Sequence, residues 1–266
     1  MSIASGSSGN CIYVGHKDTN LLIDAGISGK RIEEGLKRVG LKTADMDGIL
    51  ITHEHSDHIN GLRVVSKKYH LPVYATPGTI NEILNVKGMD MDPALFREVR
   101  YDSEFTLKDV VVDPIRISHD AAEPVCYRFY PGDSASGASS AVCTDLGTFD
   151  DYIVDKLNGV SCLLLEANHD IKMLEVGPYP YYLKKRILGE KGHLSNDSAG
   201  ELLSKLIGSG KLWQVLLGHL SKENNYAALA YETVRVQIGL LSGFMSEGLK
   251  IGIAARDVPG DMLEFE

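Results

Sequence analysis

The segment THEHSDH, residues 52–58, concentrates residue types that bind metal ions. It places His53, His55, Asp57 and His58 within six positions, although the whole chain of 266 residues has only nine histidines. Imidazole and carboxylate groups are costly to bury unless a partner holds them, and a metal ion is such a partner. Histidine nitrogen combined with carboxylate oxygen suits zinc, manganese or iron better than calcium. The motif therefore predicts a metal centre.

Six apolar runs elsewhere in the chain end in a residue that can bind metal or transfer a proton. In layered α/β folds the ligand site lies beyond the carboxyl ends of the strands. We therefore expect these ends to line one site. The runs end at Asp24, His53, His119, Asp145, Glu166 and His219.

The spacing within the motif favours two divalent ions. His53 and His55 lie two residues apart on an extended segment and can point to the same side, whereas Asp57 and His58 fall in a first helical turn. Two ions about 3.5–4 Å apart can clamp both ends of a displacement at phosphorus or at a carbonyl. The expected sets are His53, His55 and His119 for one ion, and Asp57, His58 and His219 for the other, with Asp145 bridging.

The elements that must position these residues alternate between strands and helices, which predicts an α/β fold. No stretch is long enough to act as a linker, so we expect one domain over residues 1–266. A hairpin is expected at 10–26, and Ser56 is expected to cap a helix over 57–70. Residues 131–140 are expected to form a loop. Strands are also expected at 47–53, 71–78, 104–119, 124–130, 141–147, 160–168, 212–221 and 249–257, with helices at 31–40, 79–86, 196–208 and 224–241.

Composition excludes some classes of protein. The net charge is −9, which counts against a nonspecific polyanion binder. The four cysteines have no CxxC spacing, so we interpret them as buried, reduced thiols. The chain has no signal peptide and no 18-residue apolar run, which favours a cytoplasmic protein without membrane contact.

The motifs resemble those of the metallo-β-lactamase fold, whose signature is HxHxDH. The resemblance runs over nearly the whole chain and implies a four-layer αββα sandwich. It also implies the order of the motifs. Asp24 matches the first motif, His53–His58 the second, His119 the third, Asp145 the fourth and His219 the fifth.

The nuclease branch of this superfamily is the most similar. LLLEANHD, 163–170, resembles the strand and glutamate of ribonuclease Z-like proteins, which carry histidine where this chain has Leu165. GHLSND, 192–197, resembles their histidine loop, with Leu194 inserted where serine is usual. Segments 4–10, 24–36, 117–125, 177–196 and 217–225 resemble the YycJ/WalJ group, described as metal-dependent nucleases acting 5′→3′ on double-stranded DNA with a link to mismatch repair.

Two departures narrow this resemblance. Only 47 residues separate Asp145 from His193, which leaves no room for an inserted β-CASP cap. The chain also shows no extended arm of the tRNA-processing type. Both observations count against ribonuclease J-like and tRNA 3′-processing roles.

The resulting hypothesis is a dinuclear phosphodiesterase, most simply a 5′→3′ DNA exonuclease with a role in DNA repair. Asp57 or Asp24 would orient or deprotonate the nucleophile, and Asp24 could instead hold a ligand. His193 would protonate the leaving 3′-oxygen or hold the phosphate. A role near the site is also open for Glu166. Substrate contacts are expected from Asn10, Lys184, Lys185, Arg186 and Ser195, the last at a helix N-terminus that favours phosphate, with Tyr179, Tyr181 and Tyr182 as candidates for stacking on bases.

Two alternatives remain open from the sequence. The same site could hydrolyse a small ester, thioester or cyclic phosphate, or the chain could be a non-catalytic interaction partner on a hydrolase scaffold. His55 counts against a flavodiiron-like redox role, in which glutamate usually stands at that position. The choice among zinc, manganese and iron stays open, as do cleavage of RNA and a homo-oligomeric state.

Overall fold

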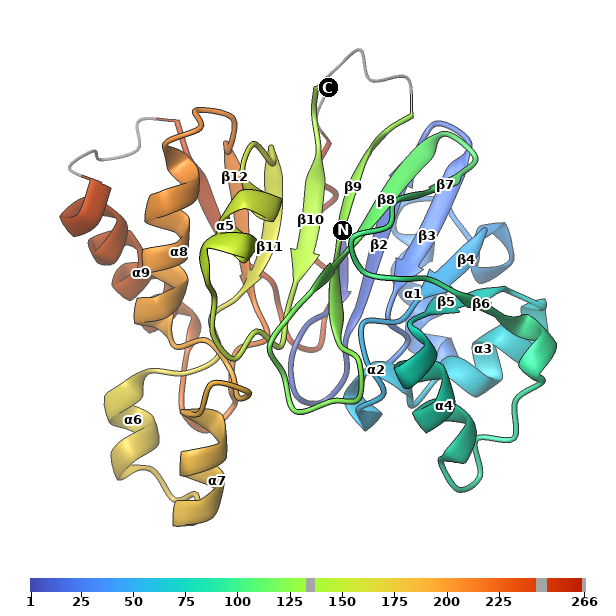
Figure 1. The fold of residues 1–266 in the computed structure, drawn as a ribbon, viewed down its shortest axis with the longest axis horizontal. Helices are drawn as coiled ribbons and strands as arrows, with labels where there is room; N and C mark the ends of the chain where they lie inside the picture. Colours follow the sequence, from blue (N-terminus) through green and yellow to red (C-terminus); the bar gives the residue numbers. More distant parts are fainter. Residues whose placement is uncertain (133–136, 243–247, 265–266) are drawn as a thin grey trace. The chain divides into compact units, whose positions relative to one another are not determined.

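The computed structural model describes residues 1–132, 137–242 and 248–264. The chain divides into two compact units (Figure 1). Unit 1 comprises residues 1–116, 121–137 and 255–266, and unit 2 comprises residues 117–120 and 138–254. The expectation of one domain over residues 1–266 stays a prediction.

Unit 1 contains a six-stranded sheet in the order β1-β2-β3-β4-β5-β6. The predicted hairpin is confirmed, since β2 and β3 are antiparallel and Lys17 in the turn adopts φ 43°. Strands β3 to β6 are parallel, so their carboxyl ends share one edge. The strands are β1 (Ser2–Ala4), β2 (Cys11–His16), β3 (Thr19–Ile23), β4 (Gly48–Leu50), β5 (Val73–Ala75) and β6 (Phe96–Glu98).

The helices of unit 1 begin just after these strands, and one prediction about them is wrong. In place of one helix over 57–70 capped by Ser56, there are two helices, and His55 stands at the N-cap position without a side-chain bond. The chain bends at Gly61, where a Cβ would lie 2.0 Å from the carbonyl oxygen of Ile27. The helices are α1 (Gly29–Lys37), α2 (Ser56–Ile59), α3 (Leu62–Tyr69) and α4 (Pro77–Asn85), with the 3-10 turns η1 (Thr43–Asp45) and η2 (Pro93–Leu95).

Unit 1 also contains three antiparallel strands, β7 (Phe105–Leu107), β8 (Val110–Arg116) and β9 (Val125–Pro131). β8 ends three residues before His119, earlier than predicted. The buried Tyr127 of β9 donates its hydroxyl to the carbonyl of Ile51 at 2.8 Å, which fixes the chain just before the THEHSDH motif.

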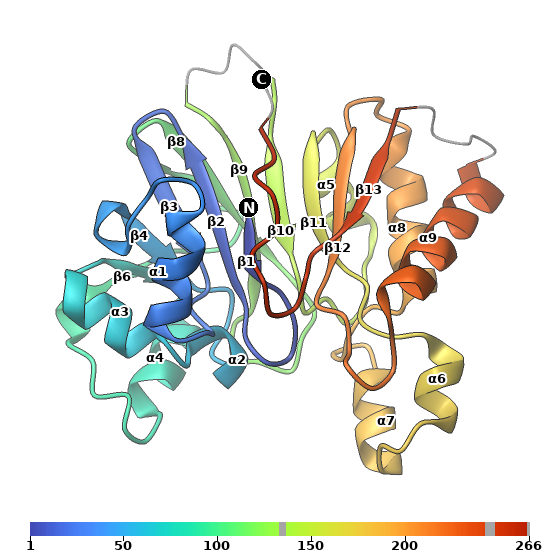
Figure 2. The same cartoon turned by 180° about the vertical axis from the view of Figure 1, so that it is seen from behind.

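Unit 2 contains four parallel strands in the order β13-β12-β11-β10. They are β10 (Ser140–Cys143), β11 (Cys162–Glu166), β12 (Gln214–Gly218) and β13 (Lys250–Ile253). The predicted apolar face of α8 (Asn196–Ile207) is buried at Ala199, Leu202, Leu203 and Leu206. Figures 1 and 2 show α8 beside α9 (Ala227–Ser242).

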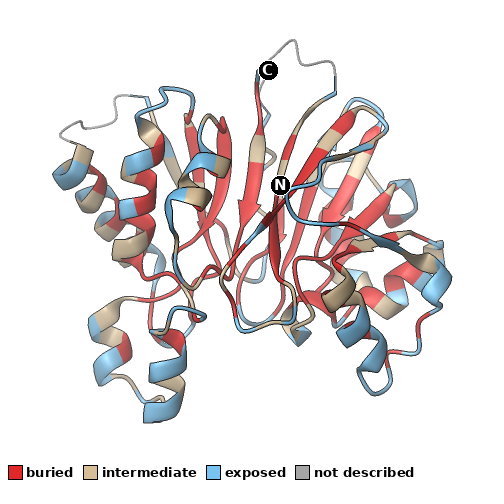
Figure 3. Ribbon diagram, in the orientation of Figure 1, coloured by how far each residue is buried: buried red, intermediate tan, exposed pale blue. Residues whose placement is uncertain are grey.

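Three short helices of unit 2 lay outside the sequence prediction: α5 (Asp151–Leu157), α6 (Ile171–Val176) and α7 (Tyr181–Ile187). Both views place α6 and α7 side by side, and they are mostly exposed, whereas the strands are mostly buried (Figure 3). All four cysteines are buried and free, as expected. Within the described ranges, no helix is long and apolar enough to cross a membrane. Of the expected 131–140 loop, residues 133–136 lie outside the described residues.

Candidate metal centre

The loop after β4 carries the four expected ligands of unit 1. Asp24, which follows β3, lies beneath this loop and is fully buried. Its Oδ1 accepts from the backbone nitrogen of Thr52 at 2.9 Å, and its Oδ2 lies 2.7 Å from Nδ1 of His58. The hydroxyl of Thr52 lies 3.0 Å from Nδ1 of His53, so one threonine contacts both histidines and the aspartate. These contacts favour the holding role for Asp24.

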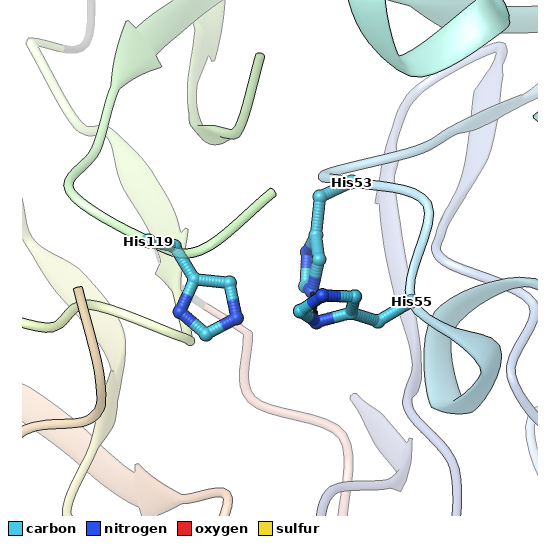
Figure 4. Close-up of side chains that lie close together, drawn as sticks. All are labelled: His53, His55 and His119. Atoms are coloured by element: carbon cyan, nitrogen blue, oxygen red, sulfur yellow. Dashed lines mark hydrogen bonds between the residues drawn. The ribbon is translucent and has the colours of Figure 1, made fainter. Parts of the chain in front are cut away.

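His53 and His55 turn their rings toward each other (Figure 4). Nε2 of His53 lies 3.0 Å from Nδ1 of His55. Two imidazole nitrogens at this separation can bind one metal ion, as their spacing in the sequence predicts. His119, the third ring drawn in Figure 4, belongs to unit 2.

His58 forms a second pair with Asp57. Because Asp24 holds Nδ1 of His58, Nε2 is the ring nitrogen left to bind a metal, and this atom lies 3.6 Å from Oδ2 of Asp57. Asn10 Nδ2 lies 3.0 Å from the same Nε2, and the Asn10 backbone donates to the Asp57 carbonyl. Asn10 thus contacts the ligand pair directly. The backbone at Gly26 packs directly against the backbone at Asp57, since a Cβ at position 26 would lie 1.6 Å from the Asp57 carbonyl oxygen.

In unit 2, the carboxylate of Asp145 lies between imidazoles. Its Oδ1 is 3.9 Å from Nε2 of His119, 3.5 Å from Nε2 of His219 and 3.5 Å from Nδ1 of His193. Asp145 and the three histidines all lie in loops. Three of these residues are buried, and the side chain of His193 is 14% exposed. The Asp145 carboxylate thus lies near His119 and His219, one histidine from each of the two expected ligand sets, and its bridging role stays a prediction.

Glu166 at the end of β11 accepts four hydrogen bonds although it is fully buried. Its Oε1 lies 2.8 Å from Nδ1 of His193 and 2.9 Å from Nδ1 of His219, and its Oε2 accepts from the backbone nitrogens of Leu146 and Leu194. The two histidines belong to the repeated tetrapeptide GHLS at 192–195 and 218–221. Each therefore keeps Nε2 as its remaining functional atom.

Glu166 and His193 shift each other's pKa. Burial alone would raise the pKa of Glu166, but the positive charge of His193 and the hydrogen bonds from His193 and His219 outweigh it and lower that pKa. Burial alone would lower the pKa of His193, but the Glu166 charge and hydrogen bond, helped by Asp145, raise it. Each group therefore favours the charged form of the other.

His119 is oriented by the backbone. Its Nδ1 lies 3.0 Å from the carbonyl oxygen of Gly192, and its Nε2 lies 3.4 Å from Oδ1 of Asp120 and 3.9 Å from Oδ1 of Asp145. The carboxylate of the neighbouring Asp120 accepts two hydrogen bonds from Arg186. Nη2 of Arg186 donates to Oδ1 at 3.0 Å, and Nε of Arg186 donates to Oδ2. Arg186, expected to contact substrate, thus holds the loop that carries His119.

Three of the expected site residues adopt backbone conformations that L-residues rarely adopt. The φ angles are 61° at Asp24, 59° at Asp145 and 55° at His219. Asp24 and His219 directly follow strands β3 and β12, and Asp145 lies two residues after the end of β10. The left-handed backbone conformation thus occurs where the chain leaves each strand. Such conformations cost about 1–3 kcal/mol and cluster at functional sites.

Of the remaining residues expected to contact substrate, Ser195 and Lys184 form hydrogen bonds within the protein. Ser195 is the N-cap of α8 and its Oγ accepts from the backbone nitrogen of Ser198 at 3.1 Å. Lys184 donates to the carbonyl of Glu175 at 2.7 Å, and Lys185 is exposed. The structure brings Asn10, Asp24 and the motif together in unit 1, and His119, Asp145, Glu166, His193 and His219 together in unit 2.

The donor sets fit divalent metal ions. In unit 2, one possible ligand atom from each of Asp145, Glu166, His193 and His219 lies within 4.8 Å of the others. In unit 1, the ring centroid of His53 lies 4.6 Å from that of His55 and 4.1 Å from that of His58. The three imidazoles of unit 1 would repel one another if they were protonated, and neutral imidazole is the form that binds a metal.

Comparison with known proteins identifies the family. The profile of the β-lactamase superfamily domain matches residues 19–214. The chain belongs to the metallo-β-lactamase superfamily. It is 40% identical to the exodeoxyribonuclease YycJ of Bacillus anthracis over 232 residues, 87% of this chain and 86% of the relative. It is 39% identical to the exodeoxyribonuclease WalJ of Streptococcus pneumoniae over 237 residues, 89% of this chain and 86% of the relative.

Solved structures of the superfamily confirm the fold. Zn²⁺-bound PqqB of Methylobacterium extorquens superposes with a TM-score of 0.72 at 15% identity, covering 99% of each chain. The predicted fold class, the α/β sandwich of the metallo-β-lactamase fold, is therefore confirmed, as is the YycJ/WalJ resemblance. The chain is a metal-dependent hydrolase, with relatives named as nucleases, and its clusters of histidine and carboxylate are suited to divalent ions.

Two contributions to the site were missed by sequence reasoning. The hydroxyl of Thr52 contacts Asp24, His53 and His58, and its position directly before the HxHxDH motif was the only available signal. Glu166 was recognised, but its shared hold on His193 and His219 was not. The repetition of GHLS was the clue, since two identical loops can present two histidines to one partner.

Proposed function

We propose that this hydrolase is a dinuclear phosphodiesterase that degrades double-stranded DNA from the 5′ end, in the cytoplasm and in the service of DNA repair. The relatives YycJ and WalJ, both named exodeoxyribonucleases, support the DNA substrate. The observation that carries the proposal is the pairing of ligand atoms. Nε2 of His53 lies 3.0 Å from Nδ1 of His55, and Nε2 of His58 lies 3.6 Å from Oδ2 of Asp57, so each pair offers two donor atoms to one ion. The pairs are adjacent, since the ring centroids of His53 and His58 lie 4.1 Å apart, and adjacent ions can act on one phosphate.

We assign the ligands as the sequence suggests, with zinc or manganese as the expected ions and iron as a third candidate. When bound, the two ions supply an activated water and neutralise charge on the phosphate. The proposed ligands are His53, His55 and His119 for one ion, Asp57, His58 and His219 for the other, and Asp145 for both.

The protein's own groups fix the protonation of these ligands. Asp24 keeps the proton of His58 on Nδ1, Glu166 does so for His219, and the Gly192 carbonyl does so for His119. In each case Nε2 is left with a lone pair for a cation. Asp57, whose side chain is 22% exposed, is the carboxylate best placed among them to orient the attacking water.

His193 is proposed as the proton donor to the leaving 3′-oxygen. Glu166 holds its Nδ1 and raises its pKa, so Nε2 carries a proton that can be transferred. Its side chain is 14% exposed, whereas His219 on the same carboxylate is 2% exposed. Ser195, Lys184, Lys185 and Asn10 are proposed to contact the DNA or its phosphates, with Ser195 acting through the N-terminus of α8.

Digestion of duplex DNA labelled at the 5′ or the 3′ end tests the proposal. With manganese or zinc, the wild type should release label from 5′-phosphorylated ends first, and Asp145→Ala should lose at least about 10³-fold in rate because the shared carboxylate is gone. Asp155→Ala, an exposed residue of α5, is the matched control and should match the wild type. Intact DNA in the presence of bound metal would overturn the proposal. Turnover of thioesters or small phosphodiesters instead would then select the alternative.

The leaving group isolates the role of His193. His193→Gln should slow DNA cleavage by about 10²–10⁴-fold, the range typical of general acid catalysis. The same variant should cleave a p-nitrophenyl phosphodiester at close to the wild-type rate, because p-nitrophenolate needs no proton to leave. Equal losses on both substrates would show that His193 binds phosphate or metal and donates no proton.

A further inference from the structure

We propose that the helical hairpin formed by α6 and α7, residues 171–187, is a strand-binding arm in which Tyr181 and Tyr182 stack on unpaired bases at the DNA end. The inference rests on the proposed function and assigns it a substrate-binding surface. Nothing in the sequence motifs of the metal centre requires this hairpin.

The exposure of the hairpin is the first observation. Tyr181 is 77% exposed and Tyr182 74%, which makes them the most exposed aromatic residues in the described part of the chain. Val176 at the end of α6 is 87% exposed. Figure 3 shows exposed residues along both helices, with a single buried residue in each, Leu174 and Ile187. These tyrosines therefore contribute little to packing.

The charge of the hairpin is the second observation. Residues 171–189 contain four lysine or arginine residues and one glutamate, a net charge of +3 within a chain of net charge −9. Attraction to the phosphate backbone is the main sequence-independent term in DNA binding. A local positive charge beside exposed aromatic rings is thus the combination used by proteins that bind single strands.

The helical spacing places these groups together. Lys185 lies four residues after Tyr181 and three after Tyr182, so its side chain neighbours both rings on the surface of α7. Lys185 is exposed, whereas Lys184 bonds to Glu175 and Arg186 bonds to Asp120. Of the basic run at 184–186, Lys185 is therefore the cation left to contact a phosphate next to a stacked base.

The two ends of the hairpin lie at the functional residues of unit 2. α6 begins five residues after Glu166, and the backbone nitrogen of His193 donates to the carbonyl of Ile187, the last residue of α7. The bond between Arg186 and Asp120 further ties α7 to the loop of His119. A strand held on α7 is consequently held next to the proposed proton donor.

Binding of a nuclease-resistant DNA tests the arm. The probe is a phosphorothioate duplex whose 5′-terminal bases are unpaired and include 2-aminopurine, added to the metal-loaded full-length protein. Tyr181→Ala with Tyr182→Ala should weaken binding by about 10–100-fold and abolish the stacking quench of 2-aminopurine, since each stacked base contributes appreciably. The phenylalanine pair should retain both. Lys185→Ala should reduce the slope of log affinity against log salt concentration by about one phosphate contact. The tyrosine variants should leave this slope unchanged.

The controls separate this inference from the proposed function. Tyr101→Ala, in unit 1, should bind as the wild type does. The tyrosine variants and the Tyr101 control should hydrolyse a p-nitrophenyl phosphodiester, which offers no base for Tyr181 or Tyr182 to stack on, at the wild-type rate. DNA cleavage by the wild type combined with full affinity in the double alanine variant would overturn the arm and leave the nuclease proposal standing. Loss of the small-substrate activity would show a purely structural role, and a wild type that binds no DNA would overturn both.

Discussion

The two units present their candidate metal ligands in different ways. In unit 1, four candidate ligands come from one six-residue segment, and one carboxylate, Asp24, holds one of them through His58. In unit 2, the residues come from separate loops, and one carboxylate, Glu166, holds two histidines. The supporting carboxylate of unit 1 thus contacts one histidine, whereas that of unit 2 is shared by two. The loss of that shared residue should therefore do more damage.

Glu166→Gln should have the largest effect. Both oxygens of Glu166 accept hydrogen bonds, Oε1 from the two imidazoles and Oε2 from the two backbone nitrogens. Glutamine replaces one of these oxygens by an NH₂ group, so either both imidazoles or both backbone nitrogens lose their acceptor. Removal of one supporting carboxylate typically costs 10–100-fold in metal affinity or activity, so two affected histidines predict about 10²–10⁴-fold. Metal content after dialysis against a chelator and the rate of DNA cleavage measure it. Glu201→Gln on the exposed side of α8 is the control, and a loss below tenfold would contradict the shared role.

Asp24→Asn should have a smaller effect, about 10–100-fold, because only His58 loses its acceptor. The asparagine can keep its oxygen on the Thr52 backbone nitrogen, but its NH₂ then faces Nδ1 of His58 and drives the proton to Nε2, the proposed ligand atom. The same metal competition measures this change, with Asp18→Asn in the β2–β3 turn as the control. An Asp24→Asn loss equal to that of Glu166→Gln would remove the contrast between the units.

His169 should make unit 2 sensitive to acid. Burial is the main cause that lowers its pKa, to about 4, and neither ring nitrogen has a hydrogen-bond partner among the described residues. In the unfolded chain this histidine becomes protonated near pH 6.5, whereas in the folded chain it stays neutral until the pH approaches 4. Above pH 6.5 the histidine is neutral in both states and the free energy of unfolding is unaffected. Below pH 6.5 the free energy of unfolding declines, by about 1.5 kcal/mol at pH 5.5.

The fluorescence of Trp213, the single tryptophan of the chain and a residue of unit 2, reports this transition in urea. His169→Phe should lose part of the decline in unfolding free energy between pH 7 and 5.5, whereas His70→Asn, at an exposed position in unit 1, should keep it. An identical decline in both variants would assign the acid sensitivity to other groups.

The contrast between the units also explains what the sequence could predict. The HxHxDH loop was predicted with its pairing because residues two apart on an extended chain and residues in a helical turn have fixed relative directions. Asp145 and His219 were found because parallel strands end at one edge. Glu166 was found at its strand end, yet its partners depend on loops that meet only in the folded chain, and side-chain hydrogen bonds over such distances leave no periodic trace in the sequence.

The short helices α5 to α7 were missed for a different reason. They have six or seven residues each, so few positions were available to show a helical period. The basic run at 184–186 was visible, but the separate partners of Lys184 and Arg186 were not, and only Lys185 keeps the freedom that the run suggested for all three. The break at Gly61 followed from a backbone contact that the sequence does not display.

The most direct test of the central claim is a crystal structure of the metal-loaded protein with anomalous data collected at the absorption edge of the bound metal. We predict two anomalous peaks per chain, one bound by His53 and His55, the other by Asp57 and His58, with Asp145 on both. A single peak, or peaks that leave either histidine pair unbound, would contradict the dinuclear assignment.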